Sequence, residues 1–181
     1  IAFIILLPHN FFNEGDPMTD KNAAIQPGQK IPAATIHIKS EDGIDAIETT
    51  DYFKDCRVVM FALPGAFTST CSAKHLPGYI DQAGKLKAAG FDKIACLAVN
   101  DANVMRAWSL ENNAEGIVDM LSDPLHEFSN ALGIVRFHGP VLGQRATRCA
   151  MVIDNGVLTH IFMEEPAAFE VSSADHVLAN I

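Results

Sequence analysis

The residue best suited to do chemistry is Cys71, because of the place that its neighbours give it in the chain. Residues 57–63 are mostly apolar and predict a buried strand, which a Pro-Gly pair then ends. Ser69 or Thr70 can cap a helix whose first turn holds the cysteine. Unpaired N–H groups and the positive end of a helix dipole favour an anion, and the thiolate is the nucleophilic form of cysteine. The pattern predicts a reactive sulfur between a strand and a helix, at the C-terminal edge of a sheet.

Thr68 and Pro64, which both precede Cys71, support this interpretation. Thr68 lies close enough in sequence for its hydroxyl to hydrogen-bond the sulfur or a substrate oxygen beside it. Pro64 can shield the site while withholding a backbone donor. A lone cysteine is otherwise most often a small buried hydrophobe. The hypothesis of a reactive thiol also requires that solvent can reach the sulfur in at least one state.

These residues carry a resemblance to a known family. Pro64, Thr68 and Cys71 match the P-x-x-x-T-x-x-C pattern of the peroxiredoxins, and PGAFTSTCSAKHLPGY resembles the type II, or peroxiredoxin-5-like, branch. The similarity continues through ACLAVND, VMRAW and RCAMVIDNG, and so covers most of the chain from about residue 23. It implies an α/β, thioredoxin-like fold with a central mixed β-sheet flanked by helices. It also implies reduction of hydrogen peroxide or alkyl hydroperoxides with an external thiol and no cofactor.

A peroxidase of this kind needs a deprotonated sulfur and donors that stabilise the departing oxygen. In this interpretation Cys71 is the nucleophile and becomes a sulfenic acid, while Thr68 orients the peroxide. Arg148 matches the family's active-site arginine and directly precedes an apolar strand. Arg145 is the second choice, and either arginine can instead be a solvated loop charge. His75 is expected to hydrogen-bond the surrounding loop rather than act as a base.

Further residues are candidates for the walls of the site. Gly65, Phe67 and Phe137 are expected to line the substrate pocket, although a plain core role fits either phenylalanine. Met105 and Trp108 are candidates for a contact between the subunits of a homodimer, as the resemblance suggests. The alternative for these two residues is burial in the interior.

The cysteine that would resolve the sulfenic acid is uncertain. Cys96 follows Cys71 at the spacing of the second cysteine in plant type II relatives, but it lies inside an apolar strand, so we favour a structural role. The animal-type resolving cysteine would follow the Glu-Pro pair near the C-terminus, where this chain has Ser172 and Ser173 instead. Glutathione with glutaredoxin, or thioredoxin, is therefore the expected electron donor.

Composition limits the alternatives. The chain has 181 residues, of which 49% are hydrophobic, enough for the core of one domain. Its net charge of −9 argues against a nucleic-acid partner. Its four cysteines show neither C-x-x-C nor the spacing of a zinc site, which favours a reducing, cytoplasmic location without a metal. Cys56 and Cys149 are expected in the core. The competing function is a peroxide-sensing redox switch that acts on a partner protein without significant turnover.

We divide the chain into residues 1–22, an N-terminal extension, and 23–181, the redoxin domain. The apolar start IAFIILLP is too short to cross a bilayer, and Met18 would be a natural first residue of the domain. Residues 1–17 are therefore an upstream segment or an artificial addition, and no membrane partner is expected.

Periodicity and turn signals predict the order of the elements in this domain. Strands are expected at 35–38 (an edge strand), 44–47, 57–63, 91–100, 118–121, 148–153 and 157–163. Helices are expected at 49–53, 72–89 with a break near Pro77-Gly78, 102–112, from about 122 to 133, and after a cap at Ser172 or Ser173.

Overall fold

The structure is a computed structural model and describes residues 23–181; the proposed extension at 1–22 lies outside the described residues. A seven-stranded mixed sheet has the order β2-β1-β5-β4-β3-β8-β9, in which β3, β4 and β5 run parallel and the other neighbours run antiparallel. A small second sheet consists of β6 and β7. The strands are β1 Thr35–Lys39, β2 Ile44–Glu48, β3 Arg57–Ala62, β4 Lys93–Ala98, β5 Asp119–Ser122, β6 Val135–Phe137, β7 Gln144–Ala146, β8 Cys149–Asp154 and β9 Val157–Met163.

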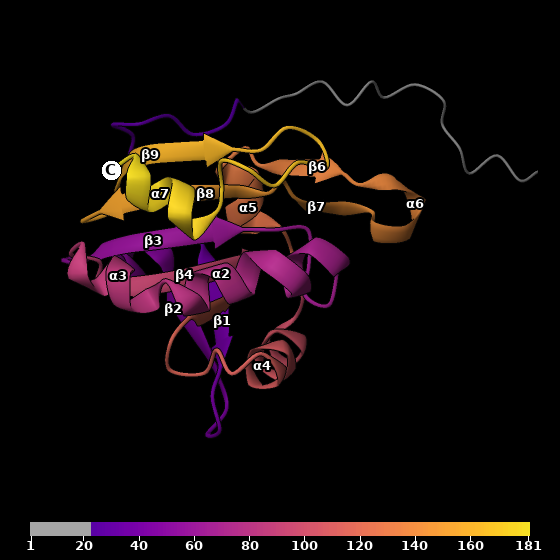
Figure 1. The fold of residues 1–181 in the computed structure, drawn as a ribbon. Coiled ribbons are helices and arrows are strands. Elements are labelled where there is room, and N and C mark those ends of the chain that lie inside the picture. Colours follow the sequence, from indigo (N-terminus) through magenta and orange to yellow (C-terminus); the bar gives the residue numbers. More distant parts are fainter. Residues whose placement is uncertain (1–22) are drawn as a thin grey trace, which may run out of the picture.

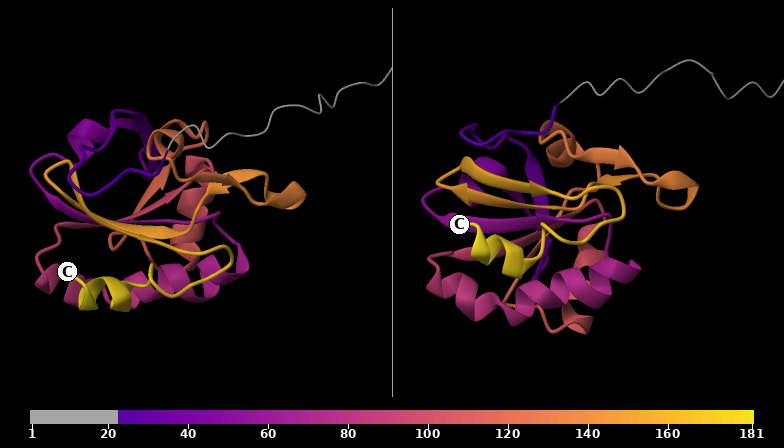
Figure 2. Two further views of the ribbon diagram at one scale, coloured as in Figure 1. Left: turned by 90° about the horizontal axis from the view of Figure 1, so that it is seen from above. Right: turned by 45° about the horizontal axis from the view of Figure 1, so that its top comes forward.

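Helices cover both faces of this sheet (Figures 1 and 2). They are α1 Thr49–Tyr52, the π-helical segment η1 Cys71–His75, α2 Leu76–Asp81, α3 Ala83–Ala88, α4 Ala102–Glu111, α5 Glu127–Ala131, α6 Gly139–Leu142 and α7 Ala174–Ala179. The view from above in Figure 2 shows α2, α3 and α7 on one side of the sheet and α1 and α5 on the other. The expected mixed α/β architecture is confirmed.

The alternation of side chains along β3 explains the two layers. Val59 and Phe61 point into a core shared with α2, α3, α4 and α7, whereas Val58 and Met60 point into a core shared with α1 and α5. Because successive side chains of a strand point to opposite faces, a strand that is apolar throughout belongs in the centre of a sheet with both faces covered.

Several predicted features of these elements were wrong. The strand at 35–38 is not an edge strand, because β2 pairs outside it and β5 pairs on its other side. The helix after Cys71 continues through Pro77-Gly78, since Pro77 occupies the first turn of α2, where a missing N–H costs little; the break comes at Gln82. The segment between the helix expected to end near 133 and the strand expected at 148–153 contains α6, between the unpredicted strands β6 and β7.

The described part of the chain gives no sign of a membrane span or a metal centre. Within residues 23–181, none of the helices has the length and apolar character needed to cross a bilayer. The same residues contain no group of three or more His, Cys, Asp or Glu arranged to hold a metal ion.

Candidate active site

Cys71 begins η1, where the chain has left β3 and entered a helical segment that starts at Ser69. The predicted cap by Thr70 was wrong: Thr70 is already helical, with φ −67° and ψ −35°, and its side chain makes no capping hydrogen bond. The turn begins earlier, because the carbonyl of Thr68 accepts a hydrogen bond from the N–H of Ser72 at 3.0 Å. A π-helical turn is rare and is frequently found at a functional site.

Arg148 reaches the sulfur of Cys71. Its Nη1 and Nη2 atoms each lie 3.5 Å from Cys71 Sγ. The sheet produces this contact, because Cys149 pairs with Ala62 and so places Arg148 just beyond the end of β3. A guanidinium in this position favours a thiolate and can hydrogen-bond an oxygen next to it.

Arg145, the second choice, does not take this position. Its Nε donates to the carbonyl of Leu142 at 2.7 Å, and its Nη1 lies 3.2 Å from where a side chain on Gly65 would begin. It packs against the loop before Cys71.

The sulfur of Cys71 is covered in this conformation, since the residue has no exposed surface. Arg148, which touches it, is half-buried. A peroxide can therefore reach the sulfur only after a neighbouring side chain or the loop moves.

The loop from Pro64 to Thr68 is held by its own hydrogen bonds. The Thr68 hydroxyl donates to the carbonyl of Gly65 at 2.9 Å, so its oxygen is left to act as an acceptor. The Ala66 N–H donates to Asn100 Oδ1, also at 2.9 Å. Pro64 is half-buried and Gly65 is buried. Asn100, the last residue of the strand expected at 91–100, thus holds this loop, a role that no local pattern in the sequence indicated.

His75 is fully buried and lies between Arg148 and the C-terminal segment. Its Nδ1 is 3.0 Å from Arg148 Nη1, and its Nε2 is 3.1 Å from the carbonyl oxygen of Ser172. Burial, and then the positive charge of Arg148, lower the pKa of His75 to about 3, so the ring is neutral at physiological pH. The expected hydrogen bond from His75 to a surrounding loop is confirmed. Of the two serines expected as possible caps of the last helix, Ser173 caps α7 and Ser172 does not.

The two phenylalanines expected to line the pocket have exposed side chains. Phe67 is 52% exposed and Phe137 is 61% exposed. The hollow beside the loop, about 520 Å³, includes Asn100 and Arg145 in its lining and neither phenylalanine. Phe67 takes the left-handed region at φ 61°, and the centroid of its ring lies 6.4 Å from that of Trp108.

Met105 and Trp108 are fully buried, so the interior alternative holds and the predicted subunit contact through these side chains was wrong. Trp108 Nε1 donates to Ser72 Oγ at 3.0 Å, which ties α4 to the helix that carries Cys71. This hydrogen bond satisfies the polar end of an otherwise apolar side chain.

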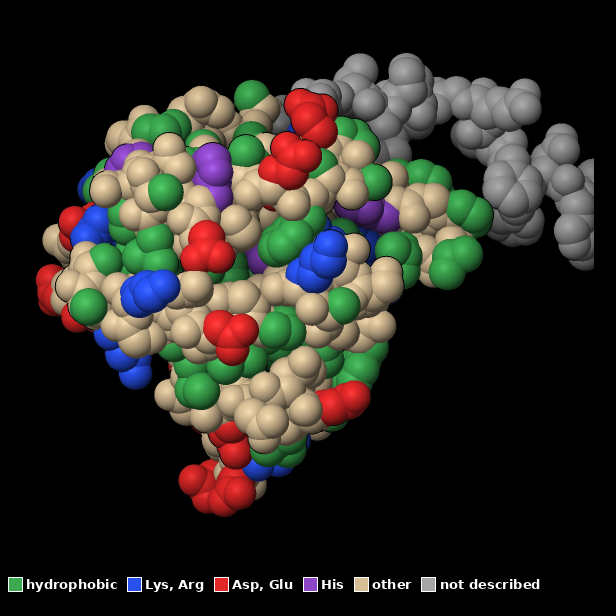
Figure 3. Space-filling model, viewed as in Figure 1, with side chains coloured by type: hydrophobic (Ala, Val, Ile, Leu, Met, Phe, Trp, Pro, Cys, Tyr) green, Lys and Arg blue, Asp and Glu red, His purple; other side chains and the backbone are tan. Residues whose placement is uncertain are grey.

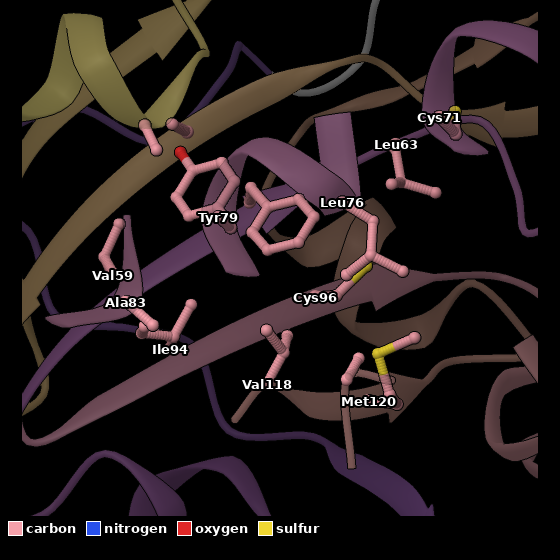
Figure 4. Close-up of a cluster of buried hydrophobic side chains, with 14 of the residues drawn as sticks. Val59, Leu63, Cys71, Leu76, Tyr79, Ala83, Ile94, Cys96, Val118 and Met120 are labelled. Carbon is pink, nitrogen blue, oxygen red and sulfur yellow. The ribbon is translucent and has the colours of Figure 1, made fainter. Parts of the chain in front are cut away.

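The other cysteines differ from Cys71 in their surroundings. Cys96 is fully buried on β4, and burial raises its pKa well above the usual value. Cys149 is also buried, and burial raises its pKa to about 12. Cys56 is only partly buried, contrary to its expected core position, and burial is the main cause of its raised pKa. All four thiols are free. Cys96 lies on β4 and Cys71 in η1, and Figure 4 shows the side chain of Cys96 beside Leu76.

Comparisons with known proteins found a matching family model and similar proteins. A family model described as Redoxin matches residues 26–178. Peroxiredoxin-2E-2, chloroplastic, of Oryza sativa subsp. japonica is 44% identical over 163 residues, covering 86% of this chain and 72% of the rice protein. Peroxiredoxin-2B of Arabidopsis thaliana is 36% identical, covering 86% of this chain and 98% of that protein.

Solved structures of similar chains are also found. The crystal structure of reduced Prx3 in complex with H2O2 from Vibrio vulnificus aligns with a TM-score of 0.83 at 46% identity, covering 86% of this chain and 98% of that one. The crystal structure of peroxiredoxin 5 from Alvinella pompejana aligns with a TM-score of 0.75 at 30% identity, covering 86% and 96% of the two chains.

Proposed function

The chain belongs to the redoxin family and is a thiol-dependent peroxidase of the peroxiredoxin kind, and from this premise we propose that Cys71 is the sulfur that attacks the peroxide. The observation that carries the proposal is the contact of both terminal nitrogens of Arg148 with Cys71 Sγ. Cys56, Cys96 and Cys149 each have a raised pKa, which disfavours the nucleophilic thiolate.

In the proposed step the thiolate of Cys71 attacks one oxygen of the peroxide. A sulfur–oxygen bond forms as the oxygen–oxygen bond breaks, and the electron pair of the broken bond leaves with the second oxygen as hydroxide or alkoxide. That oxygen takes up a proton and departs as water or an alcohol. The sulfur is oxidised by two electrons to a sulfenic acid, and the peroxide is reduced.

Arg148 and Thr68 have different parts in this step. The guanidinium favours the thiolate before attack and stabilises the negative charge that moves onto the departing oxygen. The hydroxyl hydrogen of Thr68 is directed at the Gly65 carbonyl, so the hydroxyl oxygen accepts a hydrogen bond from the peroxide and orients it. In this proposal Pro64 and Gly65 form the wall of the peroxide site, and the exposed side chains of Phe67 and Phe137 border its entrance.

An external thiol completes the cycle in this proposal. A thiol attacks the sulfenic sulfur and releases water, and a second thiol then reduces the resulting mixed disulfide. Two observations support an external donor over Cys96: that residue is buried in the middle of β4, and its pKa is raised. Glutathione with glutaredoxin, or thioredoxin, is the proposed donor class.

We also propose that the enzyme is a homodimer. Phe137 and Val141 are more than half exposed, and Figure 3 shows hydrophobic side chains over the projecting end formed by β6, α6 and β7, to which both residues belong. Apolar side chains gathered in this way favour contact with a second copy. Sedimentation of the wild-type protein and of Val141→Asp tests this: a dimer that the substitution dissociates is expected, and a wild-type monomer contradicts it.

The cytoplasmic location stays a prediction.

The test of the function compares Cys71→Ser with Cys56→Ser in a peroxide-consumption assay, with glutathione plus glutaredoxin, or thioredoxin, as the donor. The first substitution is expected to abolish turnover, because a hydroxyl cannot replace the thiolate. The second is expected to leave turnover unchanged. A Cys71→Ser protein that still consumes hydroperoxide at the wild-type rate contradicts the proposal, as does wild-type protein that is oxidised but never turns over, the behaviour of a redox switch.

A further inference from the structure

Glu164 follows the end of β9 and is almost completely buried, with 5% of its surface exposed. Its Oε1 atom accepts three hydrogen bonds: from the Glu170 N–H at 2.7 Å, from the Ser172 N–H at 2.7 Å and from the Ser172 hydroxyl at 2.8 Å. A buried carboxylate is costly unless it is well hydrogen-bonded. Here it folds residues 164–172 into a closed loop.

The loop presents one carbonyl to the active site. The oxygen of Ser172 is 3.1 Å from His75 Nε2 and 2.9 Å from the Tyr79 hydroxyl, which donates to it. Because Glu164 binds both the N–H and the side chain of Ser172, it determines where this carbonyl lies.

The chemistry of the partners determines which nitrogen of His75 carries the proton. A carbonyl oxygen can only accept, so Nε2 must hold the hydrogen that it donates to Ser172. A guanidinium can only donate, so Nδ1 must be the acceptor for Arg148 Nη1, 3.0 Å away. The neutral Nε2–H tautomer is the one form of the ring that satisfies both partners.

Aromatic rings enclose this chain of contacts. Phe61, Tyr79 and Phe169 surround His75 with ring centroids 4.8, 5.7 and 5.1 Å away. Phe169 belongs to the loop that Glu164 closes, and its ring centre is 5.8 Å from the Arg148 guanidinium carbon. Arg148 stands at one end of this chain of contacts and Glu164 at the other.

We propose that Glu164 is a positioning residue for peroxide reduction, acting through the Ser172 carbonyl and the Nε2–H tautomer of His75 to hold Arg148 against Cys71. The inference rests on the proposed function of Cys71 and Arg148. Glu164 touches neither the sulfur nor the peroxide in this account; it determines where the guanidinium lies.

The experiment compares three variants of the full chain: Glu164→Ala, Glu164→Gln and, as the matched control, Glu165→Ala. Glu165 is the exposed neighbour in the same loop. The readouts are the rate constant for oxidation of Cys71 by hydrogen peroxide and the pH at which alkylation of Cys71 is half-maximal. The alkylation profile reports the contact between Arg148 and the sulfur, which a merely structural role of Glu164 would not alter.

Glu164→Ala is expected to lower the rate constant about 10- to 100-fold, the typical cost of a reacting group displaced by about 1 Å, and to move the alkylation midpoint to higher pH. Glu164→Gln keeps an oxygen acceptor and is expected to retain most of the rate. Glu165→Ala is expected to match the wild type. If Glu164→Ala folds and keeps the wild-type rate and alkylation profile, the inference is wrong.

A measurement on the wild-type protein keeps the inference testable if Glu164→Ala does not fold. Nitrogen-15 NMR of the imidazole is expected to show His75 neutral, with the proton on Nε2. A proton on Nδ1, or a charged ring at neutral pH, overturns the inference. Neither NMR outcome depends on the Cys71→Ser assay. If the NMR result contradicts the role of Glu164, the assignment of the peroxidase function to Cys71 still stands. If that assignment is wrong, the Cys71→Ser assay shows it independently.

Discussion

Arg148 places both terminal nitrogens of its guanidinium 3.5 Å from Cys71 Sγ, although 77 residues separate the two in sequence. This two-point contact predicts that Arg148→Met slows oxidation of Cys71 by about 10²- to 10³-fold, the usual loss when a preorganised donor is removed. Arg148→Lys keeps the charge but not the planar fork, so it is expected to recover only part of the rate. Stopped-flow oxidation by hydrogen peroxide measures this. Arg145→Met is the control, and equal losses from the two methionine substitutions would contradict the assignment.

Cys96 is predicted to be dispensable for turnover. Cys96→Ala is expected to keep the wild-type rate in the donor-coupled assay, while removal of the buried sulfur lowers the free energy of unfolding by about 1 kcal/mol or more. Urea denaturation measures the stability change. Loss of turnover, together with a Cys71–Cys96 disulfide in the peroxide-treated wild type, would show instead that Cys96 resolves the sulfenic acid.

His75 makes the fold sensitive to acid. Its pKa is about 3 in the folded protein, below the ordinary value of 6.5, so between these values the unfolded chain binds the proton and the folded chain does not. Stability is therefore unaffected by this group above about pH 6.5 and falls as the pH decreases toward 3. At about pH 5 the loss is on the order of 2 kcal/mol.

Thermal melting of wild-type protein and His75→Asn between about pH 7 and pH 4 checks this prediction. The variant is expected to show a shallower decline, whatever its stability at neutral pH. His126→Asn is a suitable control, because His126 has φ 59° and asparagine tolerates the left-handed region. Parallel declines for the wild type and His75→Asn would rule out His75 as the cause.

Gly65 is predicted to be sensitive to the addition of a side chain. A Cβ atom there would lie 3.0 Å from Asn100 Oδ1 and 3.2 Å from Arg145 Nη1. Gly65→Ala is therefore expected to displace the carboxamide that binds the Ala66 N–H, to cost on the order of 1 kcal/mol and to slow peroxide reduction. Gly84→Ala, a helical position with open space around it, is expected to be neutral or stabilising. Denaturation and rate measurements that rank the two variants the other way would contradict this.

The sequence was sufficient for the parts of the fold that depend on local patterns. The apolar stretch before Pro64 predicted a buried strand, and the strands predicted at 148–153 and 157–163 correspond to β8 and β9. The helix predicted at 102–112 corresponds to α4, and Asp101 caps it, since its carboxylate accepts from the N–H groups of Asn103 and Val104. Each of these signals lies within a few residues of the structure that it specifies.

The parts that were missed depend on long-range contacts. His75 and Ser172 are 97 residues apart, and no local pattern pairs a histidine with a backbone carbonyl that far along the chain. The edge of the sheet was misplaced because the pairing of β1 with β5 joins distant segments. The resemblance to the family predicted that Cys71 and Arg148 act together. The contacts that hold Arg148 in place, through His75, Ser172 and Glu164, were visible only in the structure.

The most direct test of the account is mass spectrometry of the wild-type protein treated with one equivalent of hydrogen peroxide in the presence of dimedone, which traps sulfenic acids. The four cysteines can be distinguished in the same digest. We expect the adduct on Cys71, with Cys56, Cys96 and Cys149 remaining unmodified. An adduct on one of those three with none on Cys71 would contradict the central claim.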